Sequence, residues 1–346
     1  RMEFLRLGGL GALAGLRSRR NAIGSEGTNL AIPRAKSVII VFASGGQSQF
    51  ETWDPKPDAP REVRGEFGAI ATAVPGTFVC EHLPRLAALA NQYALIRTMS
   101  HRDVDHGSAV YLTLTGQYHQ RISSNPPPRP TDTPSLLSVF RRVRPDAGTI
   151  APAIALNGPA IVAPNEIAAG QFGGLLGRDY DPLIVGNVNE DSIAVPGLGV
   201  QPQLPTVRIR ERQRLLSAVD EFVRAGAAAE STVDGQYRKA FDLLEDPRTR
   251  QAFDLSAEPD SLRERYGRNR SGQACLLARR LAQAGVPLIT VVWNHHSRGQ
   301  DLHPEDSDAY GWDTHNDIFD AMRDRLLPRF DQTMSALLED LGARGM

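Results

Sequence analysis

The segment SHRDVDHGSAVYLTLTG, residues 100–116, gathers side chains that could do chemistry. His101, Asp103, Asp105, His106 and Ser108 precede an apolar run that ends in Thr-Gly. We expect a helix from residue 107 or 108 to 116. Ser108 could then be a nucleophile at the helix N-terminus, where backbone N–H groups would hold an oxyanion. Equally, Ser108 could only cap the helix, and the two histidines could be buried side chains that hold loop carbonyls.

A second group of side chains follows a late apolar run. Asp313 and His315 in GWDTH lie two residues apart, and on an extended segment such residues point the same way, so both could face one metal ion. Imidazole with carboxylate suits zinc, iron or manganese, and carboxylate alone suits magnesium or calcium. Alternatively, Asp313 is only a helix cap. Just upstream lie further possible ligands: His295, His296, Asp301, His303, Glu305, Asp306 and Asp308. For His303 and the neighbouring carboxylates we favour a solvated acidic loop with surface histidines.

A third polar group follows the first apolar run, in SGGQSQFETWDPKP. Gly45 and Gly46 free the backbone to bend close to a ligand. Glu51 and Asp54 offer oxygen ligands, and Lys56 could meet an anion. The alternative is a plain turn, in which Pro55 restricts Asp54.

The elements that must position these groups alternate along the chain. Apolar runs predict strands within residues 35–46, 93–100, 151–158 and 287–294. Helical spacing predicts helices at 81–92, 135–143, 206–226, 232–246 and 271–286, and a long one from 317 that Pro328 should kink. Residues 159–206 are rich in Gly, Pro, Asn and Asp and predict an elaborated loop region.

This alternation indicates a doubly wound α/β domain. In such sheets ligands collect at the carboxyl ends of the strands. All three polar groups follow predicted strands, so we expect the fold to bring them together in one site.

Composition narrows the class of protein. The 346 residues are 41% apolar and 23% charged, and 39 basic residues against 40 acidic ones give a net charge of −1, which argues against a general nucleic-acid binder. No apolar run reaches the ~18–20 residues that span a bilayer. Cys80 and Cys275 could pair, but neither lies in a C-x-x-C, and we expect both to fill core space.

Residues 1–30 predict an export signal and linker rather than part of the fold. A basic start precedes the apolar run LGGLGALAGL, residues 7–16. The pattern R-x-x-F-L-R resembles a twin-arginine signal in which Met2 replaces the second arginine, and the basic residues at 17, 19 and 20 fit a cleavage region poorly. The alternative is an N-terminal amphipathic helix.

Several motifs in order resemble one bacterial family. They are EFLRLGGLGALAG, SVIIVFASGGQSQFETWDPKPDAPREVRGEF, SHRDVDHGSAVYLTLTG, SGQACLLARRLAQAGV and GWDTHNDIF, and they run through almost the whole chain. The family they resemble is domain of unknown function 1501 (DUF1501). The resemblance implies an exported protein with an alkaline-phosphatase-like, three-layer α/β/α sandwich, mainly parallel, over residues 31–346, a fold shared with sulfatases and phosphomutases.

The resemblance also carries departures. Sulfatases have a Cys or Ser nucleophile before an apolar helix ending in Leu-Thr-Gly, and HGSAVYLTLTG places His106 at that position, where it would bind metal or form a phospho-histidine. The superfamily's first strand usually delivers an aspartate ligand, for which Glu51 or Asp54 would have to substitute. Family members are expected to continue past LLEDLGARG, so the chain to Met346 is expected to be a fragment with an unpaired sheet edge.

Three hypotheses follow from the sequence. The first is an exported, periplasmic or surface hydrolase of phosphate or sulfate esters of small molecules or glycans. It would depend on a divalent metal (Zn, Mn, Mg or Ca) bound by Asp313, His315 and His106, with His101, Asp54 and Glu51 as further candidate ligands. The second is a non-catalytic binding protein on the same scaffold, and the third is that the polar groups are structural loops only.

Overall fold

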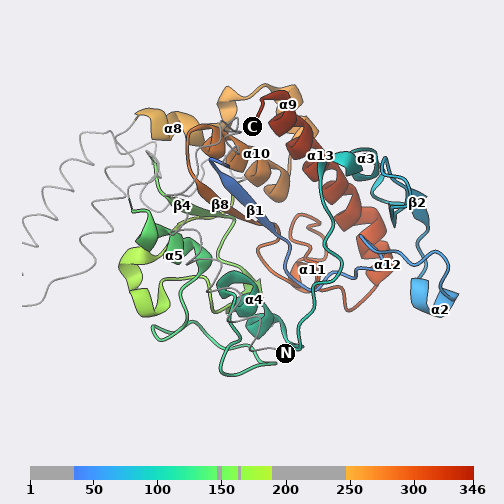
Figure 1. The fold of residues 1–346 in the computed structure, drawn as a ribbon, viewed down its shortest axis with the longest axis horizontal. Helices are drawn as coiled ribbons and strands as arrows, with labels where there is room; N and C mark the ends of the chain where they lie inside the picture. The colour runs from blue at the N-terminus through green and yellow to red at the C-terminus, as the bar shows by residue number, and fades with distance from the viewer. Residues whose placement is uncertain (1–34, 146–149, 163–164, 189–246) are drawn as a thin grey trace, which may run out of the picture. The chain divides into compact units, whose positions relative to one another are not determined.

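The computed structural model describes residues 35–145, 150–162, 165–188 and 247–346 (Figure 1). The predicted export signal and the predicted helices at 206–226 and 232–246 lie outside these residues. The chain divides after Ala35, and everything below concerns the unit from Lys36 to Met346. No helix in the described part is long and apolar enough to cross a membrane.

A four-stranded, all-parallel sheet forms the centre of this unit. Its strands lie in the order β1 (Val38–Phe42), β8 (Leu288–Val292), β4 (Ala153–Leu156), β7 (Leu183–Val185). Val38 pairs with Leu288, and Ala153 pairs with Leu288 on the other side of β8. All residues of β4 and β8 are buried, as expected for apolar runs in the middle of a parallel sheet.

Two antiparallel hairpins and a set of helices complete the described fold. The hairpins are β2 (Ala69–Ala71) with β3 (Phe78–Cys80) and β5 (Ile161–Val162) with β6 (Glu166–Ile167). The α-helices are α2 (Arg61–Arg64), α3 (Pro84–Ala88), α4 (His106–Thr115), α5 (Leu136–Val143), α8 (Pro247–Phe253), α9 (Asp260–Tyr266), α10 (Arg270–Gln283), α11 (Gly299–Leu302), α12 (Ile318–Ala321) and α13 (Leu327–Ala343).

Helices cover both faces of the sheet because successive strand residues point to opposite sides (Figure 1). Ile39 and Val41 of β1 join a large core with α10 and α13, together with Ile289 and Val291 of β8. On the opposite face, Ile40 packs in a smaller core with residues of α5 and β4, and Phe42 packs against α4. The predicted α/β class with a parallel sheet is therefore confirmed.

A buried ion network ties the helices of the larger face together. The Arg279 side chain on α10 is only 1% exposed, and it pairs with Glu258 at 2.8 Å and with Asp340 of α13 at 2.9 Å. The Tyr266 hydroxyl donates a 3.0 Å hydrogen bond to the same Asp340 carboxylate. Cys80 and Cys275 are both buried and unpaired, which confirms that they fill core space.

Two secondary-structure predictions were wrong. Residues 93–100 form no strand: Tyr93 stacks edge-on against Trp53, Arg97 pairs with Asp54, and Ile96 is 72% exposed. The segment packs against Trp53 and Asp54 and pairs with none of the described strands. The outer strand next to β4 is instead β7, inside the region predicted as loop; only three residues long, it was too short for a periodic signal.

The long C-terminal helix is interrupted where Pro328 predicted a kink. A π-helical turn, Met322–Leu326, joins α12 to α13, and Pro328 lies in the first turn of α13. Proline lacks the N–H that would continue the hydrogen-bond ladder of a preceding α-helix. A wider turn just before it absorbs the mismatch.

Candidate metal centre

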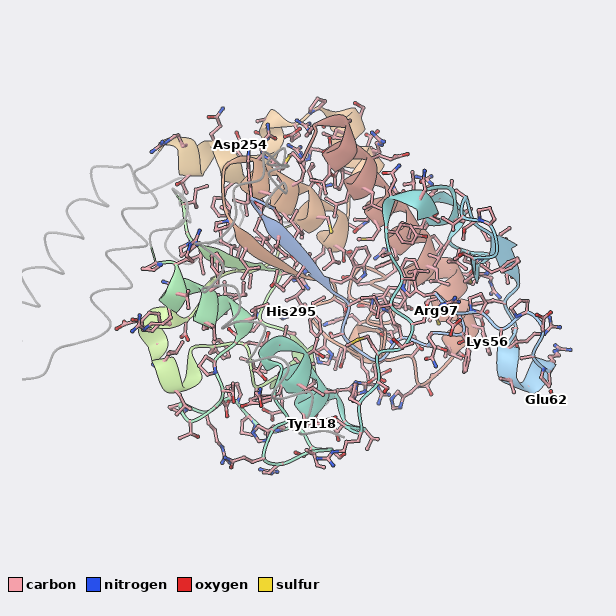
Figure 2. The ribbon with its side chains drawn as sticks, in the orientation of Figure 1. Lys56, Glu62, Arg97, Tyr118, Asp254 and His295 are labelled. Atoms are coloured by element: carbon pink, nitrogen blue, oxygen red, sulfur yellow. The ribbon has the colours of Figure 1, made fainter. Side chains whose placement is uncertain are left out.

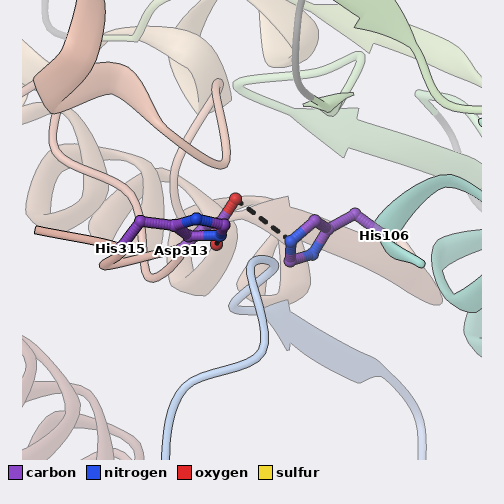
Figure 3. A group of neighbouring side chains, drawn as sticks. All are labelled: His106, Asp313 and His315. Atoms are coloured by element: carbon purple, nitrogen blue, oxygen red, sulfur yellow. Dashed lines mark ion pairs between the residues drawn. The ribbon is translucent and has the colours of Figure 1, made fainter. Parts of the chain in front are cut away.

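Three side chains from two distant segments meet at the carboxyl end of the sheet (Figure 3). His106 Nε2 lies 3.0 Å from Asp313 Oδ2, and His315 Nε2 lies 2.6 Å from Asp313 Oδ1. Each residue offers one ligand atom, and these three atoms lie within 4.8 Å of one another. We call His106, Asp313 and His315 the triad.

Packing of the GWDTH segment fixes the position of Asp313. Trp312 is 2% exposed and meets Phe330 of α13 edge to face, with ring centroids 5.7 Å apart. The Asp313 N–H donates to the Ser297 carbonyl at 3.0 Å, and the Gln300 side chain donates to the Asp313 carbonyl at 3.0 Å. The carboxylate therefore projects from a backbone held on both sides.

Glycines let three loops approach closely around this carboxylate. A Cβ on Gly45, whose φ is +119°, would lie 2.6 Å from the backbone nitrogen of Asp313, and a Cβ on Gly311 would lie 2.0 Å from the Ser297 carbonyl oxygen. Real Cβ atoms do not come so close, so both positions require glycine. The Gly-Gly turn after β1 thus packs directly against the triad, and a Cβ on Gly46 would lie 3.9 Å from the His106 ring.

His106 is the first residue of α4, whose start is fastened by the segment after the helix. The Gly107 N–H donates to Asn125 Oδ1 at 2.7 Å, and the Ser108 N–H donates to the Ser124 carbonyl at 2.9 Å. Contact with the Asp313 carboxylate raises the pKa of His106 above its usual value, against the opposing effect of burial. The imidazole is therefore held in place before any ligand binds.

Asp313 is buried, and the two histidines face its two carboxylate oxygens. It is 5% exposed, with Oδ2 lying 3.0 Å from His106 Nε2 and Oδ1 lying 2.6 Å from His315 Nε2. Besides His106, the nearest cationic atom to Oδ2 that forms an ion pair is Arg298 Nε at 3.9 Å. A buried carboxylate is a costly feature unless other groups bind it, and the two histidines that do so here are themselves possible metal ligands.

The donor set fits a divalent metal ion. Two imidazole nitrogens and one carboxylate are the ligand types that zinc, manganese and iron accept, and magnesium and calcium prefer oxygen alone. His315 is more than half exposed and His106 is partly exposed, so the triad opens to solvent on one side. Protein ligands on one side and an open side on the other are typical of catalytic rather than structural metal sites.

The other candidate ligands named from the sequence lie apart from the triad. Asp54 is engaged by Lys56 at 2.6 Å and by Arg97 at 2.8 Å, and Figure 2 shows these two cations beside each other and away from His295. Glu51 is buried against Gly65, where an added Cβ would lie 2.2 Å from its Oε1. His101 is exposed.

Ser108 is fully buried, with its hydroxyl used in both directions. The hydroxyl donates to Asp103 Oδ1 at 2.6 Å and accepts the Ser124 N–H at 3.2 Å. Burial would raise the pKa of Asp103, but hydrogen bonds from the Ser108 hydroxyl and from two backbone N–H groups, those of Ser123 and Asp105, lower it. The charge of His101 acts in the same direction, and the pKa of Asp103 is lowered overall. In this arrangement Ser108 fastens the start of α4.

Sequence reasoning missed the residues that support the triad. Arg298 and Gln300 follow β8 in HHSRGQ, and Asn294 donates to the Ser44 carbonyl, joining the ends of β8 and β1. Their position directly after a buried strand was the only signal available. Being polar residues in a polar loop, they carry no spacing that singles them out.

A family model matches most of the chain. The family described as "Protein of unknown function (DUF1501)" matches residues 35–346. No curated protein and no solved structure gives a significant match. The match covers the sheet and all three residues of the triad, and the chain therefore belongs to the DUF1501 family.

Proposed function

We propose that this chain is an exported, metal-dependent hydrolase of phosphate or sulfate esters, built on an alkaline-phosphatase-like scaffold. The observation that carries the proposal is the buried Asp313 carboxylate, whose two oxygens lie 3.0 Å and 2.6 Å from the Nε2 atoms of His106 and His315. The parallel sheet with helices on both faces supports the scaffold, and the position of the triad at its carboxyl end supports a ligand site.

The triad residues would hold the ion, and it would supply a Lewis acid that polarises the ester oxygen and lowers the pKa of a water molecule. Arg298 lies beside this site with Nε 3.9 Å from Asp313 Oδ2. Its guanidinium, which also pairs with Asp301 at 2.5 Å, would bind the anionic oxygens of a phosphate or sulfate group. His106 and His315 must be neutral to bind the ion, so loading should be favoured at mildly alkaline pH.

The proposal is tested by metal content and turnover. The chain is loaded with zinc or manganese, its bound metal is measured by mass spectrometry, and p-nitrophenyl phosphate, p-nitrophenyl sulfate and sugar sulfates are tried as substrates. His106→Ala and His315→Ala should lose metal and turnover together, whereas His101→Ala, a nearby exposed histidine outside the triad, should keep both. Full metal content in both triad variants would refute the metal centre.

A non-catalytic binding protein is the second candidate, and a specific observation favours it. His106 stands where sulfatases place their nucleophile, and the nearby Ser108 hydroxyl is fully buried and already hydrogen-bonded. Metal bound with no turnover on the ester panel would support this candidate. Ser108→Ala separates the roles: as a structural residue it costs stability only, and loss of turnover in a folded, metal-loaded variant would make Ser108 a nucleophile.

A further inference from the structure

A polar cavity of about 420 Å³ lies beside the loop that follows β8. Its walls include His295 and His296 after β8, Asn187 after β7 and Arg270 at the start of α10. The cavity therefore lies at the carboxyl ends of β8 and β7, where parallel sheets bind ligands. None of the triad residues lines it.

His296 lines this cavity and carries a ring nitrogen without a partner among the described residues. The ring is 9% exposed, and its Nδ1 accepts the Arg298 N–H at 3.2 Å, which leaves the proton of the neutral ring on Nε2. Nε2 is buried and has no hydrogen-bond partner in the described part of the chain. Burial lowers the pKa of His296, in keeping with a neutral ring.

His295 presents the complementary atom. Its Nδ1 lies 3.3 Å from the Asn157 carbonyl oxygen, which can only accept, so Nδ1 carries the proton and Nε2 is an acceptor. Burial, followed by the charge of Arg270, lowers the pKa of His295. Two adjacent lining residues thus carry one neutral donor and one neutral acceptor.

The charges around the cavity are of both signs. Arg270 contributes a cation, and Asp306 and Asp308 contribute carboxylates. Asp308 accepts the Arg270 N–H and pairs with Arg329 at 3.3 Å. A phosphate or sulfate would meet the two carboxylates, and a cation would meet Arg270, so neither charge is favoured.

We propose that the cavity binds a neutral, hydroxyl-rich ligand, namely a sugar residue. Hydroxyl groups both donate and accept, which matches the His296 donor and the His295 acceptor. The volume lies within the ~300–1,000 Å³ range of small-molecule sites, and Leu302 and Ile161 offer apolar surface to the carbon faces of a sugar ring. The inference concerns binding alone and does not depend on the proposed hydrolysis.

The test uses methyl glycosides of glucose, galactose, mannose and N-acetylglucosamine, with sodium sulfate as the charged probe, on metal-free chain. Binding is followed by calorimetry and by histidine ring resonances in NMR spectra. At least one glycoside should bind and shift the His296 resonance and not that of His315. Ala309→Phe, which fills the cavity, should weaken that binding at least tenfold, and His315→Ala should leave it unchanged.

Several outcomes overturn the proposal. They are the absence of binding by every glycoside, a sulfate that shifts His296 where no glycoside does, and glycoside binding that is undiminished in folded Ala309→Phe. If that variant does not fold, His303→Ala replaces it, because His303 lines the cavity and is exposed. Sugar binding to the metal-free chain, together with no ester turnover by the metal-loaded chain, would leave this inference standing and the hydrolase refuted.

Discussion

Asp313→Asn is the change that tests the metal centre most directly. Asparagine keeps the size and shape of the side chain and removes its charge. The carboxylate is 5% exposed and touches His106 at 3.0 Å and His315 at 2.6 Å. Because both oxygens face the histidines, no rotation of the amide can keep an oxygen on each side, and one position must become an NH₂ group, which cannot bind a cation.

The expected loss of affinity follows from the charge that is removed. A contact between charged partners contributes ~1.5–3 kcal/mol net of its desolvation. A divalent ion against a buried carboxylate belongs at the upper end, and ~3 kcal/mol corresponds to about a hundredfold change in Kd. We therefore expect zinc or manganese to bind Asp313→Asn at least a hundredfold more weakly than the unchanged chain.

The affinity is measured by competition with a chromophoric chelator at about pH 8, where free imidazole is neutral. Asp317→Asn is the matched control. Asp317 lies on the same loop with φ +49°, a conformation that asparagine also adopts readily. The control should bind metal as the unchanged chain does. Equal affinity in Asp313→Asn, or no affinity in the unchanged chain, would show that the triad is not a metal centre.

Three further predictions concern the surrounding structure. Gly45→Ala should weaken metal binding and should destabilise the fold more than Gly76→Ala does. Both glycines have positive φ, which costs alanine ~1–3 kcal/mol, but of the two only Gly45 lies against a neighbouring backbone. Equal losses of stability would contradict the close packing at Gly45. Arg279→Met should cost ~1.5–3 kcal/mol in urea unfolding, because it removes the buried cation that Glu258 and Asp340 share. Glu258 keeps Arg280 and Asp340 keeps Arg344 as partners, which limits the loss. Burial lowers the pKa of His295 in the folded chain, so the unfolded chain binds more protons and stability should fall as pH drops below about 6.5. The free energy of unfolding of His295→Asn should fall less than that of the unchanged chain between pH values of about 7.5 and 5.5. An equal fall in both proteins would show that His295 is not the residue responsible.

The sequence was most informative about the core of the fold. The runs at 38–42, 153–156 and 288–292 are strands because β-branched and aliphatic residues buried on both faces have few other places in an α/β protein. YALI at 93–96 has the same composition and forms no strand, since Tyr93 and Arg97 find partners on Trp53 and Asp54. Composition shows that a segment could form a strand, but tertiary contacts decide whether it lies beside another strand with which it can pair.

In the candidate site, too, local spacing was predictable from the sequence and tertiary contacts were not. The spacing of Asp313 and His315 is local, and the two side chains do lie on the same side, 2.6 Å apart. The choice of the third member is not local: Asp54, Glu51 and His106 all offered suitable atoms, and Asp54 was drawn to Lys56, two residues away, at 2.6 Å. His106 contacts Asp313 instead, because it begins a helix whose first turn is hydrogen-bonded to residues 124 and 125. Its ring therefore meets the Asp313 carboxylate rather than a group of its own loop. A side chain without a local counter-charge, on a rigid element that faces a strand end, is therefore a better candidate ligand than a carboxylate beside a lysine.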